Sequence, residues 1–447
     1  MGVAKDEVVI QNLGGVDLKR QVLITILAVS IIALVGVLPA AAAKPVQLEF
    51  WDMQWGEDVV AGTKALVDEW NAANPDIQVR YEMMGWGNYR EKLLAAVQAG
   101  KTPDISGGDS GMPFLFEAMG EVLHLDDLVE EWKADGRLAD MTPWAHEKWL
   151  WKGHYLGITW HIDGRAMYYR KDIFADKGID APTTWEDFMT VATKLNDPAN
   201  DFYGIVVPGK AGSYDTDQFF MTLAYQNDAN PVDDKGNLTL DTPQFLEALK
   251  FEKALVENAA PKGTPGYAFD ELKRLYQQGK AAMVFSGGFL ARDLRKEAPE
   301  IYENTAVLPV LAGPTGVQRS IGFYNAWHIY KQSKHQQEAK KFLDFLMQPE
   351  NLMKLHAANG AAWGPVYQSM AADPMYKADP IVAEFARQIL EHSVDYYYPT
   401  NVGATGLGAW GTGLADFVIN PVLVGTKTPE QALKDGQARM APMFRSR

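Results

Sequence analysis

The fold of this chain is decided by residues 46–105, which read VQLEFWDMQWGEDVVAGTKALVDEWNAANPDIQVRYEMMGWGNYREKLLAAVQAGKTPDI. Apolar and polar residues alternate over 46–50, the period of a half-buried β-strand. Apolar residues then recur at helical spacing over 59–70, and the following Asn74-Pro75 pair is a helix stop signal. The first part of this stretch therefore predicts a strand followed by a helix.

The second part of the stretch repeats this order. Apolar residues alternate again over 77–81, and apolar residues at helical spacing over 89–97 predict a second helix that ends at Gly100. A short third strand is expected to begin at 103–105. Strands that alternate with helices pair in parallel, and each helix crosses over the sheet. We therefore expect a doubly wound α/β domain.

The rest of the chain carries a further set of helices and strands. In the string PTTWEDF, Thr184 can cap a helix whose first turn holds Glu186 and Asp187. Other expected elements are strands at 202–207 and 282–285 and helices at 245–256, 269–278, 336–347, 381–391 and 428–440. The sequence has no repeat, low-complexity tract or long linker, so we expect intertwined domains rather than domains strung along the chain.

The composition excludes several classes of function. The 447 residues carry a formal net charge of −15 without any run rich in Lys and Arg, so a nucleic-acid-binding face is not expected. Binding to an anionic membrane surface is disfavoured for the same reason. The sequence has no cysteine, which removes disulfides, Cys-ligated zinc, thiol catalysis and a Cys-anchored lipid.

Residues 1–43 have the features of a targeting segment. Lys19-Arg20 precede an apolar run over 22–38, and the alanines at 40–43 form an A-x-A-type cleavage site. The alternative is an uncleaved anchor helix, because the apolar run has the minimum length for spanning a bilayer. We expect a cleaved signal peptide and a periplasmic mature protein that is soluble and has no lipid anchor.

Polar and aromatic residues follow the predicted strands, at the sheet edge where open α/β folds bind their ligands. Asp52, Gln54 and Trp55 come after the first strand. Trp86 lies in a Gly-flanked turn, and Asp109 follows the third strand. Carboxylates accept pairs of hydroxyl groups, and indole rings cover the apolar C–H face of a pyranose. The sequence therefore predicts a sugar site at this edge.

Each of these residues is also compatible with a purely structural role. Trp55 and Trp86 fit a packing role as well as a ligand contact, Trp51 could close the first strand, and Asp109 could cap the next helix. Three further indoles lie on the faces of predicted helices and are expected in the core: Trp70, Trp132 and Trp185.

Two strings resemble catalytic or cofactor motifs but carry no function. Residues 108–113, GDSGMP, are similar to the nucleophile segment of trypsin-like proteases, but that fold is all-β and this string follows a strand of an α/β domain. Residues 406–411, GLGAWG, have the dinucleotide-binding spacing but follow no hydrophobic strand. The eight histidines are scattered and show no paired metal-binding spacing, so we expect neither a metal nor a cofactor.

Seven strings spread over nearly the whole mature chain carry a family resemblance. They are FW at 50–51, NP-I-V at 74–79, KLLAAVQAGKTPDI at 92–105, YYRKDIF at 168–174, PTTWEDF at 182–188, GKAAMVFSGGF at 279–289 and TPEQALKDGQARM at 428–440. Together they resemble the extracellular solute-binding proteins of family 1, the carbohydrate group that includes maltose-binding protein. No single string is decisive, but seven in this order are specific.

The resemblance implies a two-lobed periplasmic-binding-protein fold of type II. In this α/β fold, each lobe is a doubly wound sheet flanked by helices, and hinge strands join the lobes. By chain order, the first lobe would be 44–157 plus 310–348, and the second lobe 158–309 plus 349–447. The lobes would close on the ligand by a hinge motion.

The resemblance also implies ligand contacts at matching positions. The first lobe would contribute the five residues already selected at its sheet edge. The remaining contacts would be Asp163, Tyr214, Asp215, Gly288, Phe289, Gly322, Tyr324, Trp363 and Trp410. Phe289 stands where the family commonly has Trp, which would weaken stacking there. Tyr324, like the additional candidate Arg165, is equally consistent with a structural role.

We therefore expect the substrate-binding component of an ABC importer, a monomer without enzymatic activity that passes a sugar to the membrane permease. The number of indoles favours a disaccharide or a short oligosaccharide. A polyol, a glycoside or a polyamine would also fit as the ligand, because acidic and aromatic clefts suit cations as well as sugars. The sequence is less consistent with a glycoside hydrolase, which needs two carboxylates at a defined separation across one bond, or with a structural or adhesive protein.

Overall fold

The computed structural model describes residues 1, 44–233, 235–397 and 413–444. The chain divides into two compact units, Met1–Pro45 and Val46–Arg447, and the helices and strands below all lie in the second unit. The core of the expected signal peptide and Trp410 lie outside the described residues. Within the described part of the chain, no helix has both the length and the apolar character needed to cross a bilayer.

The amino-terminal stretch folds as its hydrophobic pattern predicts. Its elements are β1 (Val46–Met53), α2 (Glu57–Ala73), β2 (Ile77–Met84), α3 (Tyr89–Ala99) and β3 (Ile105–Ser106). β1 lies between β2 and β3 and is parallel to both, which confirms the parallel sheet with crossover helices. α2 ends at Asn74, and α3 ends at Gly100, whose φ of 65° is a left-handed conformation that glycine adopts without strain.

Two long strands connect this group of strands to a second group. β6 (Ile158–Arg170) and β9 (Ser320–Ile329) are antiparallel to each other. The carboxyl end of β9 pairs with β3, and its amino end pairs with β10 (Ser393–Asp395). The last residues of β6 pair instead with β7 (Met283–Gly287) and β8 (Thr305–Val307). The strand order β2-β1-β3-β9-β6-β7 therefore runs through both groups without a break.

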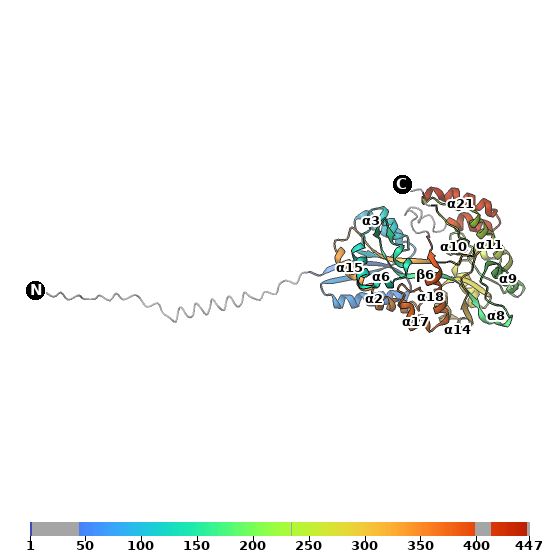
Figure 1. Cartoon of the computed structure of the whole chain (residues 1–447), viewed down its shortest axis with the longest axis horizontal. Helices are drawn as coiled ribbons and strands as arrows, with labels where there is room; N and C mark the ends of the chain where they lie inside the picture. The colour runs from blue at the N-terminus through green and yellow to red at the C-terminus, as the bar shows by residue number, and fades with distance from the viewer. Residues whose placement is uncertain (2–43, 234, 398–412, 445–447) are drawn as a thin grey trace. The chain divides into compact units, whose positions relative to one another are not determined.

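Helices pack beside both groups of strands. In Figure 1, α2, α3 and α15 lie around the first group, and α8, α9 and α11 lie around the second. With the first group belong α4 (Met112–Ala118), α5 (Asp126–Asp135), α6 (Arg137–Asp140), α7 (Pro143–Glu147), α15 (Gln336–Leu346) and the small hairpin β4 (Leu150–Trp151) and β5 (His154–Tyr155). The remaining helices are α8 (Lys171–Asp176), α9 (Trp185–Leu195), α10 (Tyr214–Gln226), α11 (Pro243–Ala259), α12 (Phe269–Gln277), α13 (Phe289–Glu297), α14 (Pro299–Glu303), α16 (Pro349–Ala358), α17 (Pro374–Lys377), α18 (Pro380–His392), α20 (Asn420–Leu423) and α21 (Pro429–Phe444).

The helices expected from the sequence are present, with ends that differ by a few residues. Thr184 caps α9 as predicted, because its Oγ1 accepts a hydrogen bond from the backbone N–H of Asp187 at 3.2 Å. Such a cap satisfies one of the unpaired donors of the first turn and stabilises a helix by about 1 kcal/mol.

The strand expected at 202–207 is wrong. This segment pairs with its neighbours only through isolated bridges, among them those at Tyr203 and Val206. At Gly204 the backbone lies so close to α9 that a Cβ atom would come within 1.8 Å of the Ala192 carbonyl oxygen. The pairing is interrupted between these two bridges, at the position where the segment passes close to α9.

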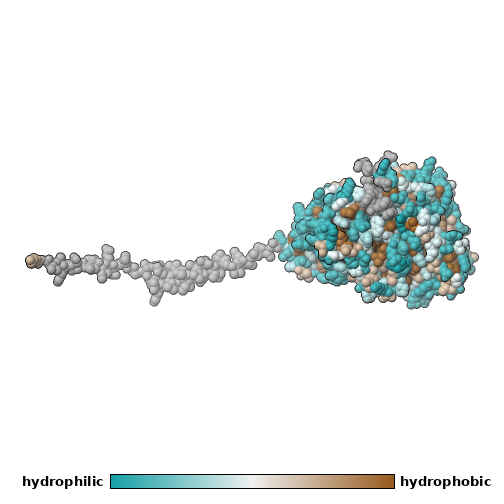
Figure 2. Space-filling model, viewed as in Figure 1, coloured by the Kyte–Doolittle hydropathy of each residue, from teal (hydrophilic) through white to brown (hydrophobic). Residues whose placement is uncertain are grey.

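Large aromatic side chains are buried in the core. Trp70, Trp132 and Trp185 are buried, as predicted, with exposed fractions of 7%, 0% and 4%. Burying one large apolar side chain contributes about 1.5–3 kcal/mol to folding. Figure 2 shows hydrophilic residues over most of the visible surface of the unit Val46–Arg447, with hydrophobic residues scattered among them.

Candidate functional site

A cavity of about 520 Å³ lies within the unit Val46–Arg447. This volume is typical of small-molecule sites, which measure about 300–1,000 Å³. The lining residues come from the loops after the first three strands, from β6 and β9, from the first turn of α3 and from the first two turns of α10. They are Trp55, Trp86, Tyr89, Arg90, Asp109, Asp163, Arg165, Tyr214, Gln218, Phe323 and Asn325.

Three of these residues follow the carboxyl ends of parallel strands. Trp55 comes after β1, Trp86 comes after β2, and Asp109 comes after β3. Loops at the carboxyl ends of neighbouring parallel strands meet at the same edge of a sheet. The structure therefore brings these three residues together, as the sequence predicted.

Trp55, Trp86 and Tyr89 form an aromatic wall. The ring centroids of Trp55 and Trp86 lie 4.9 Å apart and those of Trp86 and Tyr89 lie 5.6 Å apart, both edge to face. The indole N–H of Trp86 donates to the backbone oxygen of Gln54 at 3.0 Å, although 46% of Trp86 is exposed. A ring that is both oriented and exposed can stack on a ligand at little entropic cost.

Asp109 is a fixed negative charge in the cavity. Its carboxylate accepts hydrogen bonds from the Tyr89 hydroxyl, the Arg90 guanidinium and, at 2.7 Å, the Gly111 backbone N–H. Burial raises the pKa of Asp109, but the Arg90 charge and these hydrogen bonds outweigh burial and hold the pKa below its ordinary value. Asp109 is therefore ionised at neutral pH. The N-cap residue of α4 is Gly111 and not Asp109, although the Asp109 carboxylate accepts the Gly111 N–H.

β6 and β9 supply one side of the cavity through alternate residues. Asp163 and Arg165 come from β6, and Phe323 and Asn325 come from β9. Asp163 lies directly opposite Phe323 in the register of the two strands. Alternate residues of a strand face the same side of a sheet, so the four side chains share one face.

Arg165 is held in place by contacts on several sides. It donates hydrogen bonds to the side-chain oxygen of Gln218 and, at 2.9 Å, to Oδ1 of Asp163. Its guanidinium carbon lies 5.0 Å from the ring centroid of Phe323 and 5.4 Å from that of Phe289. Arg165, which the sequence left open between a ligand contact and a structural role, both lines the cavity and orders its neighbours.

α10 contributes Tyr214 and Gln218 from its first two turns. The hydroxyl oxygens of Tyr214 and Tyr397 lie 2.6 Å apart, and the Tyr214 ring lies 5.8 Å from that of Phe323. Tyr214, which the sequence selected, therefore joins the cavity from an element far along the chain from the first strands.

The structure places Asp52 next to the aromatic wall but not on the surface of the cavity. Asp52 is 0% exposed and accepts hydrogen bonds from the Trp327 indole N–H at 3.1 Å and the Met53 backbone N–H at 2.8 Å. The Trp55 indole N–H also donates to it, at 3.4 Å. Burial raises the pKa of Asp52 to about 7. Its contacts orient the indoles beside it.

Two other predicted residues make structural contacts. Gln54 is exposed and supplies the backbone oxygen that orients Trp86. Oδ2 of Asp215 accepts a hydrogen bond from the Phe269 backbone N–H at 3.1 Å, at the start of α12. Burial raises the pKa of Asp215.

Gly288 and Phe289 lie at the start of α13 and not on the cavity surface. A Cβ atom at Gly288 would come within 2.1 Å of the Ala362 carbonyl oxygen, so this position requires glycine. The ring of Phe289 packs edge to face against Phe269 at 4.6 Å and supports Arg165 from behind.

The other predicted residues on and after β9 are buried in the core. The Tyr324 hydroxyl donates to the Ser393 backbone oxygen at 3.4 Å, and a Cβ at Gly322 would lie 2.5 Å from Oγ of Ser393. Trp363 is 5% exposed and packs edge to face against Trp55 at 6.0 Å. These side chains support the cavity without lining it.

Five cavity residues were not selected from the sequence: Tyr89, Arg90, Gln218, Phe323 and Asn325. Tyr89 and Arg90 are the first two residues of α3, directly after the Gly-Trp-Gly turn. Their closeness to Trp86 in the sequence could have indicated that they lie at the same sheet edge. Phe323 and Asn325 alternate along β9 with the selected residues Gly322 and Tyr324. In the structure, the odd-numbered residues Phe323 and Asn325 face the cavity, and the even-numbered residues do not.

The charges of the cavity are balanced within it. Asp109 pairs with Arg90, and Asp163 pairs with Arg165. Rings, amides and a tyrosine hydroxyl make up the rest of the lining. This surface offers directional hydrogen bonds and stacking to a neutral polar ligand but no excess charge to attract an ion. Among the described residues, the single cluster of metal-ligating side chains contains no residue of the cavity.

Residues 56–353 match a family described as bacterial extracellular solute-binding protein. The matched segment contains every residue that lines the cavity except Trp55. Most of the cavity lining therefore lies in the part of the chain that carries the family pattern.

The chain is also similar to individual proteins over most of its length. It is 29% identical over 341 residues to an uncharacterized lipoprotein encoded in the oleD 5′ region of Streptomyces antibioticus (74% of this chain, 73% of the relative). It is 25% identical over 416 residues to the arabinooligosaccharide-binding protein of Halalkalibacterium halodurans (88% of each chain). The solved structure of the sugar-binding protein MalE from Xanthomonas citri matches with a TM-score of 0.77 at 23% identity (89% of this chain, 97% of that chain). This structural match confirms that the chain shares the two-lobed binding-protein fold.

Proposed function

The chain belongs to the bacterial extracellular solute-binding protein family, and we propose that it captures a sugar in the cavity and delivers it to an ABC importer. The observation that carries the proposal is the aromatic wall of Trp55, Trp86 and Tyr89 beside two carboxylates with fixed positions. Rings stack on the apolar face of a pyranose, and oriented carboxylates and guanidiniums bind its hydroxyl groups.

A sugar is favoured over a charged solute by the charge balance of the cavity. A polyamine would need unpaired carboxylates, whereas Asp109 and Asp163 are each paired with an arginine. A disaccharide or short oligosaccharide suits a cavity of about 520 Å³ whose wall extends over several rings. The names of the arabinooligosaccharide-binding protein and of the sugar-binding protein MalE support the same ligand class.

The cavity is proposed to bind its ligand without a reaction. A glycosidase needs one carboxylic acid that is protonated at working pH to release the leaving group. Asp109 is unsuited to that role, because the Arg90 charge and its hydrogen bonds keep its pKa low in spite of burial. We therefore expect a bound sugar to be recovered intact.

We propose that residues 44–157 plus 310–348 and residues 158–309 plus 349–447 are two lobes that close around the ligand. The β6–β9 pair links the two groups of strands, which makes it the natural hinge region. The aromatic wall belongs to the first of these lobes, and Asp163 and Tyr214 belong to the second. Closure would bury the sugar and present a monomeric, loaded protein to the membrane permease.

The proposed location is the periplasm, reached by cleavage of the signal peptide near residue 43. Membership in an extracellular family supports export. The Streptomyces antibioticus relative is described as a lipoprotein, whereas this sequence contains no cysteine that could carry a lipid. Mass spectrometry of the exported protein would determine its new amino terminus and any attached lipid.

Thermal melting of the exported protein with a panel of sugars, polyols, amino acids and polyamines tests the proposal. A ligand that binds only the native state stabilises it by RT ln(1 + [L]/Kd), about 4 kcal/mol at a thousandfold excess over Kd. We expect the melting temperature to rise with one or a few related sugars, which are recovered unhydrolysed. A rise only with polyamines or amino acids, or hydrolysis of the sugar, would contradict the proposal.

A further inference from the structure

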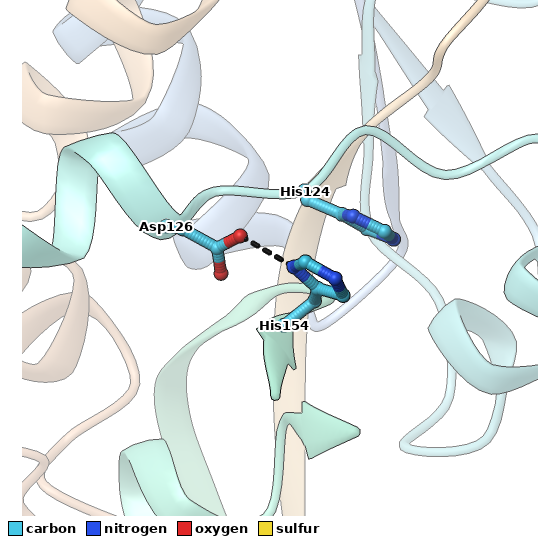
Figure 3. A group of neighbouring side chains, drawn as sticks. All are labelled: His124, Asp126 and His154. Atoms are coloured by element: carbon cyan, nitrogen blue, oxygen red, sulfur yellow. Dashed lines mark hydrogen bonds and ion pairs between the residues drawn. The ribbon is translucent and has the colours of Figure 1, made fainter. Parts of the chain in front are cut away.

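A cluster of two histidines and an aspartate lies outside the cavity. His124 precedes α5, Asp126 is the first residue of α5, and His154 begins β5 of the small hairpin. Figure 3 shows the two imidazole rings face to face, with the Asp126 carboxylate directed at His154. The proposed sugar-binding function uses none of these residues.

The potential ligand atoms of this cluster are close together. One nitrogen of each ring and one carboxylate oxygen of Asp126 all lie within 4.8 Å of one another. The ring centroids are 4.2 Å apart with an interplanar angle of 14°. Nδ1 of His154 lies 2.7 Å from Oδ2 of Asp126, and Nε2 of His124 lies 3.2 Å from Oε2 of Glu117.

The backbone around the cluster is fixed by hydrogen bonds. The Tyr155 N–H donates to Oδ1 of Asp126 at 2.8 Å, and the Leu125 N–H donates to the Tyr155 carbonyl at 2.9 Å. The Leu123 N–H donates to the Ile329 carbonyl of β9 at 2.8 Å. The loop and the hairpin are thus tied to each other, and the loop is tied to the main sheet. The side chains are therefore held near one another before any ligand binds.

Asp126 and the neighbouring Glu117, the two carboxylates that contact the histidines, lack partners with a permanent positive charge in the part of the chain that the structure describes. Among the ion pairs of the described residues, Glu117 and Asp126 pair with His124 and His154, respectively, and with no Lys or Arg. A neutral histidine leaves the negative charge of its carboxylate uncompensated. A bound divalent cation would compensate both carboxylates.

We propose that His124, Asp126 and His154 form a binding site for a divalent transition metal ion, with Zn²⁺ as the representative ion. Imidazole and carboxylate are suitable ligands for zinc, at distances of about 2.0–2.2 Å. A tetrahedral ion with such bonds separates its ligand atoms by roughly 3.3 Å. The ligand atoms lie up to 4.8 Å apart and the two rings are stacked, so metal binding requires the side chains to rotate until both rings direct a nitrogen at the ion.

Each group has a defined role in this site. The Asp126 carboxylate and one nitrogen of each imidazole bind the metal, and water completes the tetrahedron. Glu117 accepts the Nε2–H of His124, which leaves Nδ1 of that ring with a free lone pair for the metal. The carboxylate of Asp126 can only accept, so Nδ1 of His154 carries the proton of the neutral ring in the metal-free site. If the metal takes Nδ1, it replaces this hydrogen bond and the proton moves to Nε2, so the neutral ring loses no proton overall. The ion would cross-link the loop at 124–126 to the β4–β5 hairpin.

Isothermal titration of the chelator-treated protein with ZnCl₂ tests the site. We expect one Zn²⁺ per chain, and a loss of at least about tenfold in affinity in the double variant His124→Gln/His154→Gln. His335→Gln is the matched control, because His335 lies outside the cluster, and it should bind zinc like the wild type. Co²⁺ should give the visible absorption of a tetrahedral ion in the wild type but not in the double variant.

The sugar response separates a lost metal site from a misfolded protein. The double variant should show the same ligand-induced rise in melting temperature as the wild type, since its substitutions lie outside the cavity. Zinc binding of equal affinity in the double variant, or no stoichiometric binding by the wild type, would overturn the proposal. Neither result would affect the proposed sugar function, which the panel of ligands tests independently.

Discussion

At the scale of single residues, Trp86 is the most exposed aromatic residue of the cavity. Its ring contacts are with Trp55 and Tyr89 of the aromatic wall. Replacing Trp86 by alanine removes a stacking surface while leaving the core intact, since Trp86 is already 46% exposed. We expect the affinity for the sugar to fall roughly 10- to 100-fold. The free energy of unfolding should change by less than about 1 kcal/mol. Isothermal titration and urea denaturation measure the two quantities.

The matched control for this experiment is Trp151→Ala. Trp151 is a partly buried indole on β4 that does not line the cavity. Its removal should leave the sugar affinity unchanged. Equal affinity losses in the Trp86 and Trp151 variants would show that the aromatic wall is not the binding surface.

Asp52 predicts a dependence of stability on pH. Burial raises its pKa to about 7, whereas in the unfolded chain it titrates near 3.8. Between these two values the folded state binds the proton more tightly than the unfolded state, so stability falls as the pH rises. The slope contributed by one such group is at most about 1.4 kcal/mol per pH unit.

The variant Asp52→Asn isolates this contribution, because it cannot ionise. Urea midpoints at pH 5 and pH 8 should show that the wild type loses more stability than the variant over this interval. The comparison of slopes is independent of the hydrogen bond to Trp327 that asparagine weakens at both pH values. Parallel pH profiles for the two proteins would contradict the raised pKa.

Residue types and strand ends predicted the cavity residues that follow β1, β2 and β3 better than those on β9. Trp55, Trp86 and Asp109 were selected because each follows a strand of a parallel sheet, and all three line the cavity. Their position after a strand depends only on local order. On β9 the sequence suggested Gly322 and Tyr324, but Phe323 faces the cavity. Both faces of this strand are buried, so polar and apolar residues do not alternate along it. The sequence therefore did not indicate which alternate set of residues faces the cavity.

At the scale of elements, a buried ion pair joins two segments far apart in the sequence. Lys148, after α7, pairs with Asp395 of β10, and the two side chains are 1% and 0% exposed. Burial lowers the pKa of Lys148 and raises that of Asp395, in both cases against their mutual attraction. Oδ1 of Asp395 also accepts the Tyr397 N–H at 2.9 Å, and the Tyr397 hydroxyl contacts Tyr214 of the cavity.

Replacing Lys148 by alanine should destabilise the protein by about 3–5 kcal/mol, because it leaves Asp395 buried without its partner. Lys64→Ala is the control: its pair with Asp68 is exposed at 66% and 63% and contributes less than about 1 kcal/mol. The double variant Lys148→Met/Asp395→Leu should recover much of the loss. Urea denaturation measures all three, and equal midpoints for the two single variants would contradict the role assigned to the buried pair.

The elements of residues 46–105 were predictable because periods of 2 and 3.6 residues alternate there. β6 and β9 were harder to predict, since their residues are nearly all buried and show no clean period. A continuous apolar run fits a buried strand or a buried helix equally well. Their pairing with each other and with neighbouring strands decides that these segments are strands.

At the scale of the whole molecule, the proposed lobes predict closure on the ligand. The scattering radius of gyration of the exported protein should decrease when a sugar identified by the melting screen is added, because closure brings the lobes together. Trp86→Ala should need a higher sugar concentration for the same decrease. Identical scattering curves with and without saturating sugar would contradict a hinge mechanism.

The sequence by itself determined the α/β class, the family, and the aromatic and acidic residues after the first three strands. These features depend on local hydrophobic periods and on short sequence strings, which can be recognised without knowledge of the tertiary structure. Only the tertiary structure decided that Asp52 is buried, that Arg165 and Phe323 line the cavity, and that the charges of the cavity are paired. Such properties arise where segments far apart in the sequence meet, and no local pattern specifies which faces they turn to one another.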